Sequence, residues 1–425
     1  MAIRVFGSYA DILKHQGTGS FVIAGALGRL SRATSGIGTI LLVVGVTHSY
    51  ALAGSVAAAI VIGMAAVTAL WSRAMDSRGQ LAVLPYSIAA SILSGAALLL
   101  VVVLDAPTWT WFVAAFLVGA GSLDMGTLVR ARWANVLTVP GQRHTALALE
   151  SVNDELIFVI GPPLVTILAT LINPVVGFSV GVGISVIGGI SLLLQRSTAP
   201  IKANHADARP VHGGLLPHGV LGVMPLHLGV GIVFGAIDIT AVGVARAHGQ
   251  DWIAGIILAG FALGSVVSGL IFGPLSVHWS PRRRVLIAAV AYAIGVPLMV
   301  LVSSIWVLIP VVFIGGIVTT PMLIAGISLI EGATERHRLT EALTWPAVSL
   351  AVGVTLGAAV AGFVIDAANS WAGFWVTTAG ALLVGGYGLI SAFLRFLRRG
   401  HRIIGDAGGL GFTCPPGSPR LDSGS

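Results

Sequence analysis

The stretch that decides the fold runs from Ala146 to Ile172 and has the sequence ALALESVNDELIFVIGPPLVTILATLI. It is long enough to cross a bilayer as one helix, because a span needs roughly 20 predominantly apolar residues. Three acids, Glu150, Asp154 and Glu155, interrupt the apolar residues. Ionised groups inside a membrane helix are costly and usually mark the path of an ion or a substrate. The stretch therefore predicts a membrane protein that transports a solute.

The composition excludes an ordinary soluble protein. Hydrophobic residues make up 56% of the chain and charged residues 9%, whereas a soluble domain carries about 25% charged residues. The single cysteine, Cys414, leaves no internal disulfide and no cysteine metal site. Residues 1–16 are polar and weakly basic, and the apolar run from Phe21 is too long for a cleavable signal sequence. We expect that run to be the first membrane span.

Twelve apolar runs, separated by short polar, glycine or proline breaks, can each cross the membrane. Their approximate ranges are 21–46, 50–72, 80–104, 108–131, 143–171, 174–195, 218–245, 252–276, 283–303, 305–330, 339–365 and 371–397. We predict an all-α integral membrane protein with twelve transmembrane helices in two pseudo-symmetric six-helix bundles. The predicted bundles comprise residues 1–195 and 218–398, joined by a cytoplasmic linker at 196–217. The polar tail at 399–425 is expected to be disordered.

The basic residues predict the orientation in the membrane. With the N-terminus in the cytoplasm, the inside loops hold thirteen Lys and Arg residues and the outside loops hold only Arg246. The thirteen are Arg73, Arg78, Arg130, Arg132, Arg143, Arg196, Lys202, Arg209, Arg282, Arg283, Arg284, Arg336 and Arg338. Cytoplasmic loops of membrane proteins carry such an excess. We therefore expect cytoplasmic termini in a bacterial plasma membrane, and we expect no nucleic-acid partner.

The two halves of the chain are weakly similar to each other. A shift of 201 residues places Ala53-Gly54 on Ala254-Gly255 and Gly63 on Gly264, and a shift of 197 residues places Phe116–Gly119 on Phe313–Gly316. Internal repeats of this kind are typical of secondary transporters, whose substrate site lies between the halves near the bilayer midplane. The repeat and the equal span counts favour a duplicated six-helix unit.

One junction between spans carries a family motif. Residues 72–80, SRAMDSRGQ, resemble the G-x-L-a-D-r-x-G-r-R signature of the major facilitator superfamily, with Asp76 on its aspartate and Gly79 on its second glycine. Serine replaces the first glycine, Ser77 replaces the usual arginine and Gln80 a basic residue. The resemblance implies a gating loop that includes Arg73, Asp76, Arg78 and Gly79. The alternative is an ordinary loop acid paired with a neighbouring arginine.

A second motif concerns the direction of transport. Gly161-Pro162-Pro163 resembles part of the antiporter motif that proton-coupled drug exporters of the superfamily carry in span five. Ile157 stands where that motif has another glycine. The alternative is a helix bend with no bearing on direction, because proline inside a helix favours a kink. The segments RARW at 130–133 and ALESVNDE at 148–155 also resemble bacterial, largely actinobacterial, drug and metabolite efflux members of the superfamily, whose substrates are mostly unassigned.

Six charged residues are predicted to lie at similar depth in the first half. Counted from the cytoplasmic helix ends at about 1.5 Å per residue, they lie roughly 10–18 Å deep. They are Arg29, Arg32, Asp124, Glu150, Asp154 and Glu155. Two arginines facing four acids leave uncompensated negative charge, and burial and like-charge repulsion then favour protonation of at least one acid.

We expect Asp154 or Asp124 to take the proton, and Arg29 and Arg32 to hold this charge network or an anionic group of the substrate. A permanent salt-bridge network that only fixes helix packing is the alternative.

Asp238 is the deep acid of span seven and is a candidate for the substrate cavity. It is expected either to contact a cationic substrate or to carry a proton; the alternative is a hydrogen-bonded acid that caps a polar pocket. No histidine or cysteine pair has metal-ligand spacing on one helix, so no metal site or cofactor is expected. The chain has no G-x-x-x-x-G-K phosphate loop and no nucleophile–base pair, so we expect no enzyme and no ATP-driven pump.

Together these observations predict a secondary active transporter, expected to be monomeric, whose partners are a small-molecule substrate, protons and the lipid bilayer. Proton-coupled export of a drug-like or metabolic compound is the leading hypothesis. Proton-coupled uptake of a small metabolite is the first alternative, and a receptor or scaffold without transport is the second.

Overall fold

The computed structural model describes residues 10–200, 221–275, 280–331 and 339–408, and these residues form helices and no strand. The first half comprises α2 (Thr18–Thr47), α3 (Tyr50–Arg78), α4 (Gln80–Val103), α5 (Thr108–Gly121), α6 (Met125–Val136), α7 (Pro140–Leu171) and α8 (Pro174–Leu194). The second half comprises α9 (Met224–Ala247), α10 (Ile253–Leu275), α11 (Pro281–Gly295), α12 (Ile305–Glu331), α13 (Leu339–Ala367) and α14 (Gly373–Gly408). Short 3-10 turns are η1 (Arg196–Thr198), η3 (Pro297–Leu301) and η5 (Ser370–Ala372).

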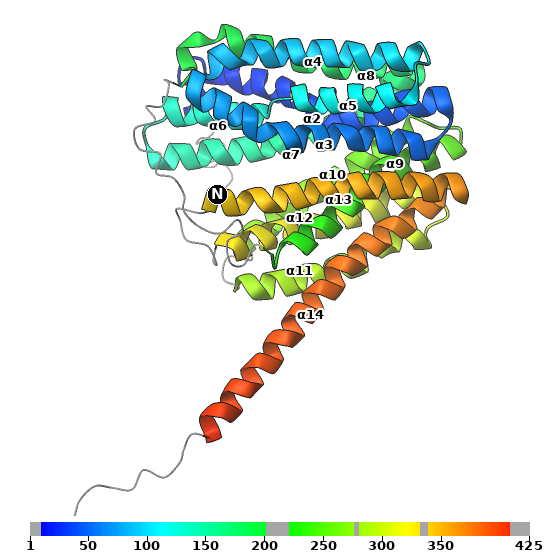
Figure 1. The fold of residues 1–425 in the computed structure, drawn as a ribbon. Coiled ribbons are helices and arrows are strands. Elements are labelled where there is room, and N and C mark those ends of the chain that lie inside the picture. Colours follow the sequence, from blue (N-terminus) through cyan, green and yellow to red (C-terminus); the bar gives the residue numbers. More distant parts are fainter. Residues whose placement is uncertain (1–9, 201–220, 276–279, 332–338, 409–425) are drawn as a thin grey trace, which may run out of the picture.

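The predicted fold class is confirmed. In the described residues, 11 helical segments are long and apolar enough to cross a membrane, and α10 contributes a shorter apolar stretch at Ile253–Gly269. Helices α2–α8 form one group and α9–α14 a second group beside it (Figure 1). The boundaries that we predicted for the bundles and the linker remain predictions, because residues 201–220 lie outside the described part of the chain.

Span four differs from its prediction as a single helix over 108–131. The chain leaves the helix at Ser122–Asp124, so that α5 ends at Gly121 and α6 begins at Met125. Glycine and serine are poor helix formers. Asp124 caps the new helix, because its carboxylate accepts a hydrogen bond from the amide N–H of Gly126 at 3.0 Å. Asp124 is therefore a capping residue at a break and not an acid inside a continuous helix.

The last helix is longer than predicted. Helix α14 continues to Gly408, past the expected end near residue 398, and so includes the first ten residues of the tail that we expected to be disordered. The segment RRGHRIIGDAG contains no proline, and its glycine at 400 weakens a helix without ending it. The rest of the tail lies outside the described residues.

The weak internal repeat corresponds to equivalent helix contacts in the two halves. A Cβ on Gly63 of α3 would collide with the carbonyl oxygen of Phe116 in α5, and a Cβ on Gly264 of α10 would collide with that of Phe313 in α12. The matched pairs Gly119 with Ile60 and Gly316 with Phe261 show the same close approach. Glycine lets helix backbones approach closely in a bilayer, so these positions explain why the repeat retains glycine.

The bundle has two ends that are used as reference points below. At the linker end, α3 meets α4 and α8 leads into η1. At the far end, α2 meets α3 and α13 leads into α14. The two halves meet along α3 with α13 and along α7 with α10.

Candidate functional site

A buried ion pair joins α2 to α7 inside the first half. The guanidinium of Arg29 donates to Oε2 of Glu150, and the side chains are 1% and 0% exposed. The other carboxylate oxygen, Oε1, accepts the indole N–H of Trp133 from α6 at 2.8 Å. Phe21 packs edge-on against that indole, with ring centroids 4.8 Å apart. Glu150 is thus held by one charged and one neutral donor from two other helices.

Asp154, one turn further along α7, lies between two arginines. Arg130 of α6 donates to its Oδ2, and Nε of Arg29 is 3.5 Å from its Oδ1. Nε and Nη1 of Arg29 and Oδ1 of Asp154 are buried and have no hydrogen-bond partner. Buried polar groups usually have partners, so this cluster is incompletely satisfied. We call Arg29, Arg130, Trp133, Glu150 and Asp154 the Arg29 network.

The structure brings only some of the predicted charges together. Arg32 is exposed, with its guanidinium 5.9 Å from the centre of the Phe158 ring, and makes no ion pair in the described part of the chain. Asp124 is engaged at the start of α6. The side chain of Glu155 lies outside the description.

Arg130, which we placed in a cytoplasmic loop, belongs to the network instead. Two arginines therefore face two acids, Glu150 and Asp154, and the expected surplus of acids does not occur within the network. Arg130 joins the network because span four breaks early. The new helix after the break, α6, carries Arg130 on the side that contacts α7.

Asp238 lies half-buried on α9, and no hydrogen bond or ion pair joins it to another described residue. One turn earlier on that helix, Phe234 packs edge-on against Phe261 of α10, with centroids 5.7 Å apart. The neighbouring Ile239 meets Gly54 of α3. Asp238 is therefore an acid without a protein partner on a helix that touches both halves, and its role in a substrate cavity stays a prediction.

The predicted gating loop is a helix end joined by a single residue. Helix α3 continues through Arg73 and Asp76 to Arg78, and Gly79 alone connects it to α4 with φ of 87°. No residue before Gly79 breaks the helix, and a positive φ of this size favours glycine. Arg73 and Arg78 are exposed, whereas the side chain of Asp76 lies outside the description, so the gating role stays a prediction.

The Gly161-Pro162-Pro163 motif lies where α7 packs tightly. A Cβ on Gly161 would come within 3.1 Å of Ala33 and Thr34 on α2. On the other side, Gly255 of α10 leaves no room for a Cβ against the backbone of Pro163. The motif therefore joins α7 both to its own half and to the second half. Helix α7 continues through both prolines.

Sequence reasoning missed the buried role of Arg132. Its fully buried side chain donates to Gln80 Oε1 at 3.2 Å, to Thr198 Oγ1 at 2.9 Å, and to the carbonyl oxygens of Leu192 and Gln195 at 2.8 Å each. These acceptors come from the start of α4, the end of α8 and η1. The RARW motif at 130–133, which contains Arg132, was the available signal, but nothing in it distinguished a loop arginine from a buried one.

Sequence reasoning also missed Asp366, which connects the halves at the far end. Its carboxylate accepts hydrogen bonds from the Ser49 hydroxyl at 2.9 Å and from the amides of Tyr50 and Ala51 at 3.0 and 2.8 Å. An acid on α13 thus caps the N-terminus of α3 in the other half. Nearby, Arg246 of α9 donates to the carbonyl oxygen at position 44 on α2, at 3.1 Å.

Comparison with known proteins relates the second half of the chain to a family. The family model described as Major Facilitator Superfamily matches residues 219–409. A POT family transporter in complex with 5-aminolevulinic acid has a similar structure, with a TM-score of 0.67 at 12% identity, over 89% of this chain and 96% of that one. The second half of the chain therefore matches the major facilitator superfamily, and the whole chain shares the fold of that transporter.

Two further transporters share the fold. The nucleoside transporter NupG aligns with a TM-score of 0.63 at 14% identity, over 88% of this chain and 98% of that one. A bacterial homolog of the human lysosomal transporter Spinster, in an inward-facing and unoccupied conformation, aligns with 0.64 at 15%, over 89% and 95%. No curated protein matches the sequence. At these identities the likeness to solved structures shows the fold.

The superfamily match and the Arg29 network lie in different halves. The matched residues cover α9–α14, whereas the network joins α2, α6 and α7. The superfamily match and the membrane-length helices support a multi-pass membrane protein with a transporter fold. The chemistry of this member therefore has to be argued from its own residues.

Proposed function

We propose that this superfamily member moves a small organic solute across a bacterial plasma membrane by alternating access coupled to protons. The Arg29 network carries the proposal. Asp154 is a titratable acid held between Arg29 and Arg130, in a site that retains unpaired buried N–H groups. Titratable groups of this kind within a membrane domain are typical of proton relays.

Of the two acids that we considered, Asp154 is the one whose protonation would change more helix contacts. Asp124 already accepts an amide hydrogen at the start of α6, and protonation would weaken that cap. Protonation of Asp154 would instead remove its attraction for Arg130. Arg29 would then keep only its ion pair with Glu150 within the network. A proton would thereby loosen the packing of α6 against α7 while α2 stays attached to α7.

The far end supports alternating access. The polar contacts of Asp366 and Arg246 are few, and their groups can exchange protein partners for water. With cytoplasmic termini, as the basic residues predict, this end faces outward, and these contacts join the two halves there. Opening it would need α3 to separate from α13 and α7 from α10.

Export is the direction that we propose, because Gly161-Pro162-Pro163 resembles part of the antiporter motif. The motif lies at the contact of α7 with the second half. A change of packing at this contact would move the halves relative to each other. Uptake by symport is the alternative outcome of the test. A receptor or scaffold without transport is the third outcome.

Transport assays in oriented vesicles test the proposal. Candidate solutes come from comparing the metabolite and drug-resistance profiles of cells that lack or overproduce the protein. Everted vesicles energised by an acidic lumen should accumulate the solute if export is correct, whereas right-side-out vesicles should accumulate it if uptake is correct. Asp154→Asn should abolish gradient-driven accumulation while solute exchange continues. Asp105→Asn, at an exposed far-end acid, is the matched control.

Two results would count against this function. Unchanged coupling in Asp154→Asn would remove the proton role from the Arg29 network. Absence of accumulation in both vesicle orientations, for every solute that the profiles identify, would favour the scaffold.

A further inference from the structure

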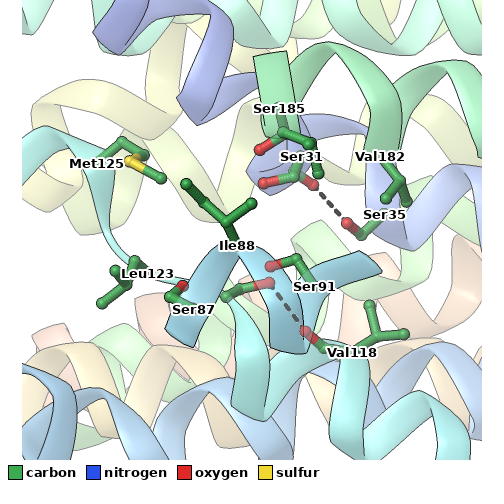
Figure 2. A pocket seen from close by; sticks show the side chains of 12 residues that line it. Ser31, Ser35, Ser87, Ile88, Ser91, Val118, Leu123, Met125, Val182 and Ser185 are labelled. Carbon is green, nitrogen blue, oxygen red and sulfur yellow. Dashed lines mark hydrogen bonds between the residues drawn. The ribbon is translucent and has the colours of Figure 1, made fainter. Parts of the chain in front are cut away.

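A small cavity lies beside the break in span four. Its volume is about 20 Å³, enough for one water-sized guest, because a water needs roughly 10–15 Å³ measured in the same way. Six serines from α2, α4, α8 and the break line it. They are Ser31, Ser35, Ser87, Ser91, Ser122 and Ser185. Figure 2 shows four of these side chains, those of residues 31, 87, 91 and 185, grouped around Ile88.

Most of these hydroxyl groups have already used their single hydrogen. Ser87 and Ser91 donate to the carbonyl oxygen at position 121, at 2.8 and 3.2 Å. The other three donors bond to carbonyl oxygens at 2.6 to 2.9 Å, and they are Ser35, Ser122 and Ser185. A hydroxyl has one hydrogen and two acceptor lone pairs. Five of the six can therefore offer a guest only acceptor oxygen, which excludes an anion.

Both helix ends at the break line this oxygen-rich cavity. Val118 of α5, which ends at Gly121, and the following Ser122 form part of the wall, and so does Met125 at the start of α6. The C-terminal end of a helix carries roughly half a negative charge. The C-terminal ends of interrupted membrane helices coordinate small cations in several transporter folds. The lining contains no carboxylate, which argues against a divalent ion.

We propose that this cavity binds one sodium ion, with the serine hydroxyl oxygens as ligands. Oxygen-only coordination suits a hard monovalent cation, and the volume excludes a larger hydrated ion. The site would fasten the break between α5 and α6 to three other helices. It is separate from the Arg29 network, because Ser31 lies about 200° around α2 from Arg29. The sodium site does not depend on the proposed proton coupling.

Binding and stability of the full-length protein in detergent test this proposal. Equilibrium binding of radioactive sodium by scintillation proximity should saturate at about one ion per chain. Sodium chloride should raise the thermal unfolding temperature relative to choline chloride or potassium chloride at equal ionic strength. Ser35→Ala and Ser122→Ala should each weaken sodium binding about tenfold, the usual effect of losing one contact to a charged group.

Ser55→Ala is the matched control, because Ser55 donates to the carbonyl four residues earlier in α3, as Ser35 does in α2, but lies outside the cavity. Its sodium affinity should equal that of the wild type. If the wild type binds no radioactive sodium and unfolds at the same temperature in all three salts, the proposal is wrong and the cavity holds water only. That measurement needs no variant, so a folding defect cannot obscure it, and it needs no transport assay.

Discussion

Two arginines are buried in the first half, and their partners differ in kind. Arg29 is bonded to carboxylates and retains two N–H groups without a hydrogen-bond partner. Arg132 is bonded to a side-chain amide, a hydroxyl and two backbone carbonyls. The partners of Arg132 do not titrate, so its bonds persist at every physiological pH. The partners of Arg29 can take up protons, so its surroundings can switch.

The positions of the two arginines agree with this difference. Arg132 lies at the linker end and binds the last carbonyls of α8, where a positive charge is favourable because the helix dipole is negative there. Arg29 lies deeper, between α2 and α7, and has no helix end to neutralise. Arg132 is therefore best understood as a permanent clamp and Arg29 as part of a switch, and four predictions test this comparison.

The largest effect is expected for Glu150→Ala. This change removes the main partner of a buried arginine and leaves only the longer contact with Asp154 to compensate its charge, which costs up to about 3–5 kcal/mol. Thermal and denaturant unfolding in detergent would measure the loss. The double variant Arg29→Met, Glu150→Leu should recover most of it, because a buried ion pair can often be replaced by apolar residues. A double variant as unstable as Glu150→Ala would show that the charge itself is not the cause.

Arg132→Ala should cost somewhat less, about 2–3 kcal/mol, because it strips four acceptors of their donor but water can reach the linker end. No second substitution should restore the stability, since two of the partners are backbone carbonyls. Arg132→Lys should recover only part, as an ammonium cannot reach acceptors in a planar arrangement. The same unfolding measurement at pH 6 and pH 8 should give equal losses. A loss that changes with pH would contradict the clamp.

Hydropathy and charge were sufficient to predict twelve spans, because a bilayer demands apolar helices of fixed length. The break at Ser122–Asp124 was not predictable in that way. It depends on Ser87 and Ser91 of another helix satisfying a carbonyl that the break exposes. The grouping of Arg29 with Glu150 and Asp154 could be predicted, because the three residues lie at equal depth on neighbouring helices.

The partners of the other charges could not be predicted from depth. Arg130 joined the network and Arg32 did not, because rotation about each helix axis decides which neighbour a side chain meets. Asp366 was missed for a related reason. Two of its three partners are backbone amides, which leave no trace in the sequence.

A smaller effect is expected for the pair of Arg130 and Asp154. Both side chains are partly exposed, at 35% and 21%, so solvent screens their attraction, and the coupling should be about 1 kcal/mol. A double-mutant cycle of Arg130→Gln and Asp154→Asn on unfolding would measure it. The same cycle should show a weaker coupling at high salt than at low salt, since salt screens the attraction between partly exposed charges. A coupling that does not differ from zero would remove this pair from the contacts that hold α6 against α7.

The smallest effect on stability is expected at the far end, from Asp366→Asn. The substitution keeps the shape of the cap but weakens its attraction for the amides of Tyr50 and Ala51, by about 1 kcal/mol. Such a change should raise the population that is open at this end about fivefold. Spin labels at Thr108 and Ala368, exposed far-end positions in different halves, would report it as a larger share of long distances. Asp105→Asn, which bridges no halves, should leave the distances unchanged. If Asp366→Asn leaves the distance distribution unchanged, the Asp366 carboxylate only stabilises the N-terminus of α3. The conformational change of this chain would then depend on the Arg29 network and not on the polar contacts at the far end.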